Sequence, residues 1–155
     1  MLSLKARLRR ETRDFLCNIQ LPHPHAITLS HKMVYHGPSG PVRNNPDYCR
    51  KNLRYFFHMR AQEVGLTTGD EIRRIAVLET DASGRFHYHL IVALPTFRLR
   101  MNIVGNLWLT WPQTHWGYDT FHAEPITDLP GYILYITKRE YGGAECGIDW
   151  FNTRL

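Results

Sequence analysis

The sequence predicts an α+β fold in which helices pack against an antiparallel central sheet of four to five strands. Residues 85–94 have the pattern of a core strand, with β-branched and aromatic side chains and no internal glycine or proline. Residues 72–80 have the pattern of its hairpin partner. Helix and strand patterns otherwise interleave along the 155 residues, an order compatible with an antiparallel or mixed sheet. Strand 85–94 is expected to be central.

The first half of the chain supplies a helix, a strand and a second helix. Residues 4–16 are amphipathic with a basic side and predict a helix. After a proline-rich break, residues 26–30 predict a short strand, and residues 31–45, rich in glycine and proline, predict a loop. The pair Asn45-Pro46 is typical of a helix start, and apolar spacing carries that helix to about residue 64.

Three elements follow the predicted hairpin. Residues 98–111 have apolar side chains at helical spacing, and residues 117–126 predict an outer strand. The run Asp128-Leu129-Pro130, a capping residue with a proline in the first turn, starts a last helix over about 129–140. The tail 142–155 has no clear pattern.

Composition indicates one globular domain over residues 1–155. Hydrophobic residues make up 43% of the chain, yet no apolar run approaches the roughly 20 residues of a membrane helix. We therefore expect no membrane partner. Three widely spaced cysteines and no apolar leader suggest a reduced, cytoplasmic setting. The net charge of +5 suits a polyanionic partner, although many ordinary proteins are as basic.

Two histidines point to a candidate metal site. His87 and His89 are two apart on the predicted central strand, so both point to one side. If the hairpin is centred on Ser83, Glu79 lies opposite His87 and shares that side; a centre between residues would turn it away. Two imidazoles and a carboxylate can bind one divalent ion, and by ligand type alone zinc would also fit. Alone, the pair also fits two solvent-facing histidines, and Glu79 a solvated carboxylate.

A stripe on the last helix supplies a candidate nucleophile. Tyr132, Tyr135 and Lys138 are spaced by three, so they share one helix face. An aromatic stripe often packs into a core, but that explanation leaves the lysine in the stripe unexplained.

Basic and aromatic side chains are candidates for nucleic-acid contact. Arginines on helix 4–16, cations in loop 31–45 and an outward arginine on the following helix can contact phosphates, or simply be solvated. The expected DNA-binding residues are Arg7, Arg10, Lys32, Arg43 and Arg54. Trp108, Trp111 and Trp116 could stack bases, but at least two are expected to be core.

These motifs resemble the HUH endonuclease superfamily, in particular the rolling-circle replication initiators of plasmids and single-stranded DNA phages. His87-Tyr88-His89 resembles the metal motif, and the run Tyr135 to Lys138 resembles the Tyr-x-x-Lys motif. Residues 26–30 resemble the first-strand motif weakly, and the resemblance covers about residues 26–140. It implies a ferredoxin-like, RRM-like HUH fold, Mg²⁺ or Mn²⁺ as cofactor, and nicking and joining through a 5′-phosphotyrosine intermediate.

The sequence departs from the family pattern in two places. Tyr88 stands where an aliphatic residue is common, and Tyr132 and Tyr135 are spaced by three rather than four. We therefore expect Tyr135 to be the single nucleophile, assisted by Lys138, with Tyr132 a possible second tyrosine. No helicase domain accompanies the motifs, so the resemblance implies a host helicase and polymerase, single-stranded or hairpin DNA at an origin, and a monomer or dimer.

Other functions compete with this hypothesis. A single-tyrosine transposase of the same superfamily suits the length, although Lys138 fits the initiator motif better than the glutamine usual there. A relaxase places its tyrosine near the N-terminus. A basic nucleic-acid-binding module would explain the charge but not the histidines, tyrosine and lysine together. A metal hydrolase in which water attacks is a further alternative.

Overall fold

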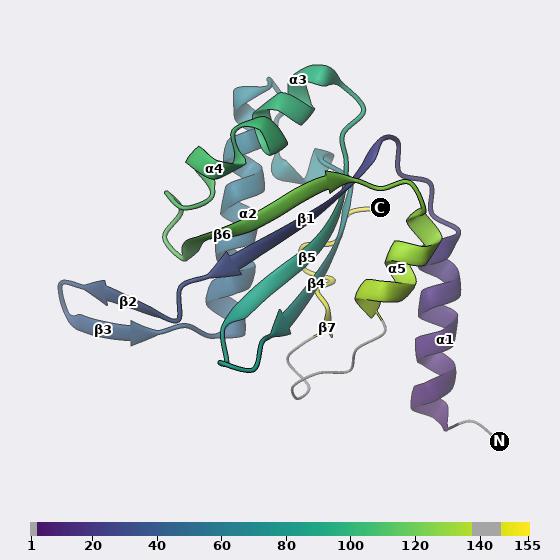
Figure 1. Cartoon of the computed structure of the whole chain (residues 1–155), viewed down its shortest axis with the longest axis horizontal. Coiled ribbons are helices and arrows are strands. Elements are labelled where there is room, and N and C mark those ends of the chain that lie inside the picture. The colour runs from purple at the N-terminus through teal and green to yellow at the C-terminus, as the bar shows by residue number, and fades with distance from the viewer. Residues whose placement is uncertain (1–2, 138–146) are drawn as a thin grey trace.

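The computed structural model describes residues 3–137 and 147–155. Its main sheet has five strands in the order β6-β1-β5-β4-β7, and every neighbouring pair is antiparallel (Figure 1). The strands are β1 (Pro24–His31), β4 (Arg74–Thr80), β5 (Phe86–Ala93), β6 (Gly117–Pro125) and β7 (Gly147–Ile148). The predicted α+β fold is confirmed, with the His-x-His strand β5 in the centre of the sheet.

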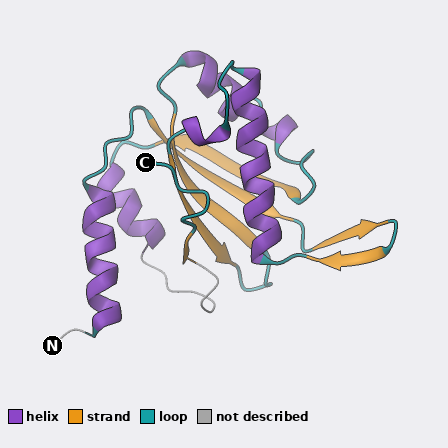
Figure 2. Cartoon of the chain, turned by 180° about the vertical axis from the view of Figure 1, so that it is seen from behind, coloured by secondary structure: helices purple, strands orange, loops and turns teal. Residues whose placement is uncertain are grey.

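One face of the sheet is covered by α2 (Pro46–Glu63), which lies across the strands in Figure 2. The side chain of Asn45 caps this helix by accepting a hydrogen bond from the Tyr48 N–H, as the sequence predicted. Its buried residues Leu53, Phe56 and Phe57 pack against Leu90 and other even-numbered residues of β5. This is the larger of the two apolar clusters, and burying it is the main driving force for folding.

The other face is covered by α1 (Leu4–Cys17) and α5 (Leu129–Thr137). Leu16 of α1 and Ile133 and Ile136 of α5 form a second cluster with Ile75 and Ile91 of the sheet. The two helices pack against each other as well (Figure 1). In the described ranges, no helix combines the length and the apolar character needed to cross a bilayer.

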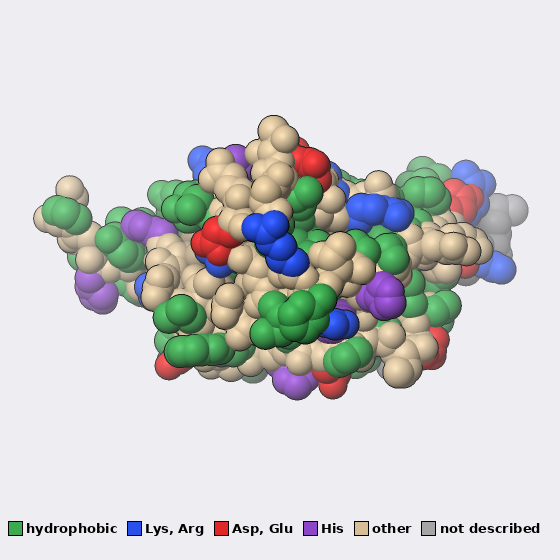
Figure 3. All heavy atoms as spheres, turned by 90° about the horizontal axis from the view of Figure 1, so that it is seen from above, with side chains coloured by type: hydrophobic (Ala, Val, Ile, Leu, Met, Phe, Trp, Pro, Cys, Tyr) green, Lys and Arg blue, Asp and Glu red, His purple; other side chains and the backbone are tan. Residues whose placement is uncertain are grey.

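The predicted loop 31–45 is wrong in part, because it contains a two-stranded ribbon. Strands β2 (Val34–Gly37) and β3 (Gly40–Arg43) pair antiparallel around a tight turn. Gly40 has φ +106°, a conformation that glycine adopts without strain, so the glycine- and proline-rich composition served a hairpin. Figure 1 and Figure 3 show this ribbon extending from the body of the molecule.

The predicted helix 98–111 is interrupted. It divides into α3 (Phe97–Arg100), a π-helical turn (Met101–Gly105) and α4 (Leu107–Thr110). Its apolar spacing is real, because Leu99, Ile103, Leu107 and Trp111 are all buried in the larger cluster. Glycine weakens the regular helix at position 105, and the wider π turn keeps these side chains on one face.

The unassigned tail joins the sheet. Strand β7 pairs with β4, and Arg154 forms an isolated bridge with Arg74. The hydroxyl of Tyr88 donates a hydrogen bond of 2.5 Å to the buried carboxylate of Asp149. Tyr88 thus has a structural task on the α2 side of the sheet, which explains a tyrosine in the middle of the His-x-His motif.

Candidate functional site

The β4–β5 turn sets the register of the candidate site. The carboxylate of Asp81 accepts hydrogen bonds from the N–H and hydroxyl of Ser83 and from the N–H of Arg85. Gly84 takes φ +82°, which a side chain would strain. The hairpin is centred on Ser83, so Glu79 lies opposite His87, the register that the sequence analysis required.

Glu79, His87 and His89 form a compact group at one end of the α1–α5 face. The Glu79 Oε2 atom lies 3.5 Å from His87 Nε2 and 3.3 Å from His89 Nε2. One ligand atom from each residue lies within 4.8 Å of the other two. An ion about 2.0–2.2 Å from each ligand would separate neighbouring ligands by about 3.0–3.5 Å. The group therefore fits a divalent ion.

The surroundings of the group favour metal binding. Glu79 is buried and both imidazoles are only partly exposed. Burial alone would raise the pKa of Glu79, but polar contacts with His87 and His89 outweigh it and lower that pKa to about 2. The Thr28 hydroxyl lies 3.3 Å from His89 Nδ1 and can fix the tautomer that leaves Nε2 free to bind a metal.

Helix α5 brings two tyrosines to this group. The Asp128 carboxylate accepts a hydrogen bond from the Gly131 N–H, so the helix starts where the sequence predicted. The Tyr135 ring centre lies 6.4 Å from that of His89 and 5.8 Å from that of Tyr132.

The two tyrosines differ in their surroundings. Tyr135 is 63% exposed, so its ring is open to a large substrate. Tyr132 packs against the second apolar cluster, and burial, with the phenol of Tyr135 and the carboxylates of Glu124 and Glu79 nearby, raises its pKa to about 12. Tyr135 is therefore the more accessible phenol and Tyr132 the harder one to ionise.

The family comparison agrees with this geometry. The family model for the replication-associated protein ORF2 family matches residues 24–140, about three quarters of the chain and all of the motif-bearing strands. The chain belongs to this family of HUH-type rolling-circle replication initiators. No curated protein and no solved structure gives a significant match.

The other predicted site residues of this replication-associated protein are dispersed. Lys138 lies outside the described residues. Arg7 and Arg10 are exposed on α1 and form weak ion pairs with residues one turn further on. Lys32 Nζ donates to the His115 carbonyl, and Arg43 is exposed at the end of β3. Arg54 lies on α2, on the far side of the sheet from the histidines, 3.6 Å from Asp70.

Sequence reasoning gave no role to Arg85 and Thr28. Arg85 shares the odd-numbered side of the β5 strand with the histidines; its guanidinium donates to the His31 carbonyl and lies 3.9 Å from the Tyr118 ring centre. Thr28 pairs with His89 across β1 and β5. Residue parity could have found Arg85, but Thr28 required the register between strands 61 residues apart.

Proposed function

We propose that the protein nicks and rejoins single-stranded DNA, with Tyr135 as nucleophile, and so initiates rolling-circle replication of a plasmid or phage. One observation supports this above the others: the exposed Tyr135 ring lies beside His89 of the Glu-His-His group. Three side chains from one hairpin and a phenol from a helix distant in the sequence then face one space.

In the proposed reaction the Tyr135 oxygen attacks a backbone phosphorus. A bond from the tyrosine oxygen to phosphorus forms, and the bond from phosphorus to the 3′ oxygen breaks. The leaving oxygen takes up a proton and becomes a free 3′ hydroxyl, while the 5′ phosphate stays on the tyrosine. Attack by a 3′ hydroxyl reverses the step and rejoins the strand. The 3′ end can meanwhile prime a host polymerase.

Tyr135 needs help, because a tyrosine hydroxyl with its ordinary pKa of about 10 is a weak nucleophile at neutral pH. Glu79, His87 and His89 would hold Mg²⁺ or Mn²⁺. Such an ion polarises the scissile phosphate and stabilises the negative charge that develops on it. We assign Lys138 the orientation of the phosphate, because it follows Tyr135 by one helical turn in the sequence.

The remaining assignments belong to the same proposal. The DNA would be single-stranded or a hairpin at an origin, opened by a host helicase, since the attacked backbone must be unpaired to enter the site. Arg7, Arg10, Lys32, Arg43 and Arg54 would bind phosphates. Residues 1–155 would fold as one domain and act as a monomer or dimer. Tyr132 would support Tyr135 by packing and serve as nucleophile only in its absence.

The test uses a pool of random-sequence single-stranded DNA labelled at the 3′ end, because the origin sequence is unknown. With Mn²⁺, the wild-type protein should give a labelled adduct that survives a denaturing gel, and sequencing the trapped DNA would reveal the cleavage site. Tyr135→Phe should give no adduct, and EDTA should abolish it. Tyr118→Phe, which removes another phenol on this side of the sheet, is the matched control and should react normally.

Three outcomes would contradict the proposal. An adduct that persists in Tyr135→Phe would move the role to Tyr132 or to Tyr141. Metal-independent DNA binding without an adduct would indicate a binding module, and cleavage without a covalent product would indicate attack by water. Excision and joining of a hairpin-flanked segment by the wild type would favour the single-tyrosine transposase over the replication initiator.

A further inference from the structure

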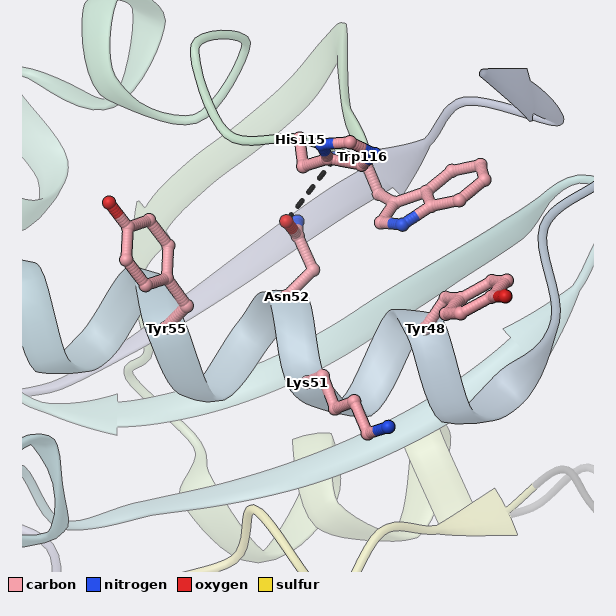
Figure 4. Close-up of a pocket in the computed structure, with 6 residues that line it drawn as sticks. All are labelled: Tyr48, Lys51, Asn52, Tyr55, His115 and Trp116. Atoms are coloured by element: carbon pink, nitrogen blue, oxygen red, sulfur yellow. Dashed lines mark hydrogen bonds between the residues drawn. The ribbon is translucent and has the colours of Figure 1, made fainter. Parts of the chain in front are cut away.

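A second concave site lies on the α2 side of the molecule, away from the Glu-His-His group (Figure 4). It has a volume of about 320 Å³. Helix α2 supplies four of its residues and the segment before β6 supplies two. The lining residues are Tyr48, Lys51, Asn52, Tyr55, His115 and Trp116.

Aromatic rings form a continuous array on one side of this pocket. The His115 ring lies 3.8 Å from that of Tyr35 and 5.5 Å from that of Trp116, measured between centres. Trp116 in turn stacks on Tyr48 at 5.2 Å with the planes 12° apart. Tyr55 stands across the pocket from this array in Figure 4 and is 55% exposed. The faces left open are therefore those of His115 and Tyr55.

The polar group between these rings is committed to holding the array in place. Asn52 is buried; its amide nitrogen donates to the Thr114 hydroxyl and its amide oxygen accepts from the Trp116 N–H (Figure 4). The pocket is thus built before any ligand binds, so little ordering entropy would be lost on binding.

The charge around the pocket favours an anionic ligand. Among the described residues that line it, the ammonium group of Lys51 is the only formal charge at neutral pH. Lys32 adds a second cation, since its Nζ lies 3.3 Å from the His115 carbonyl. The nearest carboxylate along α2, that of Asp47, is 3.1 Å from Arg50 and so already paired.

The pocket and the Glu-His-His group lie at the same end of the sheet, on opposite faces. His87 pairs with Ser30, and the next residue, His31, pairs with Gly117, which directly follows Trp116. Adjacent strands are about 4.8 Å apart and a helix packs about 10 Å from a sheet. A single strand that leaves one site can therefore reach the other within a few nucleotides.

We propose that this pocket binds an unpaired base of the DNA strand, stacked between Tyr55 and His115, with the adjoining phosphate on Lys51. The proposal rests on the proposed function, because that function supplies single-stranded DNA as the ligand. Stacking on aromatic side chains beside cations is how single-strand binders hold bases without sequence preference. The pocket would anchor the strand on one side of the cleavage position.

The test measures binding of a fluorescently labelled 15-nucleotide oligothymidine to the full chain with EDTA present, so that no cleavage can occur. Tyr55→Ala should weaken binding roughly 5- to 100-fold, and Tyr55→Phe should retain it. Lys51→Ala should lower the slope of log affinity against log salt by about 0.7, as expected for one lost phosphate contact. Phe97→Ala removes an equally exposed ring on α3 and should bind as the wild type does.

A second readout does not depend on the stability of variants. Oligothymidine with 5-iodouracil, irradiated in complex with the wild type, should cross-link to Tyr55 or His115. Equal affinity of Tyr55→Ala and wild type, or cross-links only elsewhere, would overturn the proposal. So would loss, in Tyr55→Ala, of binding to a proline-rich peptide but not to DNA, which would assign the pocket to a peptide.

The two proposals fail separately. If Tyr55→Ala loses affinity while the wild type forms no adduct with Mn²⁺, the pocket binds DNA but the nicking proposal is wrong. If the wild type forms the adduct while Tyr55→Ala binds normally, the pocket proposal alone is wrong.

Discussion

Replacing Tyr88 with phenylalanine tests why a tyrosine stands between the two histidines. Both Tyr88 and Asp149 are buried, and the hydroxyl of one donates to the carboxylate of the other at 2.5 Å. Burial and the adjacent carboxylate raise the pKa of this phenol far above its usual value, so it stays protonated and donates. Tyr88→Phe removes the donor and keeps the ring.

The expected cost follows from what Asp149 retains. A hydrogen bond to a charged group contributes about 1.5–3 kcal/mol. The carboxylate keeps the Asn152 amide at 2.8 Å and the Phe151 N–H at 3.1 Å, so it is not left without donors. We therefore expect Tyr88→Phe to lower the free energy of unfolding by about 1.5–3 kcal/mol, or the Tm by roughly 3–12 °C for a chain of this size.

Urea unfolding at pH 7 measures this loss. Tyr118→Phe removes a hydroxyl from a ring that stacks under Arg85 and should change stability by less than about 0.5 kcal/mol. A double-mutant cycle with Asp149→Asn should give a coupling energy of at least about 1 kcal/mol. Unchanged stability in Tyr88→Phe, or a coupling near zero, would refute the anchoring role of this tyrosine.

Three other side chains give further tests. Glu79→Gln should weaken Mn²⁺ binding at least about tenfold by calorimetry, and equal affinity would contradict the ion site. Burial lowers the pKa of His31 to about 3 from its usual 6.5, so below pH 6.5 only the unfolded chain takes up this proton. Stability should therefore fall with pH by up to about 1.4 kcal/mol per unit more in the wild type than in His31→Gln, down to about pH 3; parallel urea profiles would contradict this. Arg13 donates to the Thr137 carbonyl at the end of α5, so Arg13→Ala should cost about 0.5–1 kcal/mol and slow adduct formation. Arg10→Ala, on the exposed side of α1, is its control and should change neither.

Strong periodicity and capping made most of the fold predictable. The strand around His89 had alternating apolar residues, and the helix after Asn45 had both a cap and a proline in its first turn. What failed depended on weaker signals. The ribbon of β2 and β3 has few apolar residues to mark it, and the π turn at Met101–Gly105 leaves helical spacing nearly intact. Strand β7 is held by tertiary contacts rather than by its own sequence.

Predictability of the site followed sequence distance. Glu79 could be placed beside His87 because a single turn joins them, and the turn residues fix its centre. The pocket around Tyr55 could not be foreseen, because it needs α2 and the segment before β6 to meet across more than 50 residues. Trp111 and Trp116 are core, as expected, while Trp108 is exposed.

The place of Tyr135 follows from where the apolar surface of the sheet ends. Along β4, Ile75 and Val77 are buried in the second apolar cluster, and the next residue on that side is Glu79. Helix α5 covers the cluster with Ile133 and Ile136. Tyr135, which immediately precedes Ile136, therefore stands at the border where apolar packing gives way to the ligand group. The same burial that fixes the helix thus sets the reach of the phenol, and a one-residue slip of β4 against β5 would remove Glu79 from this side without moving the helix.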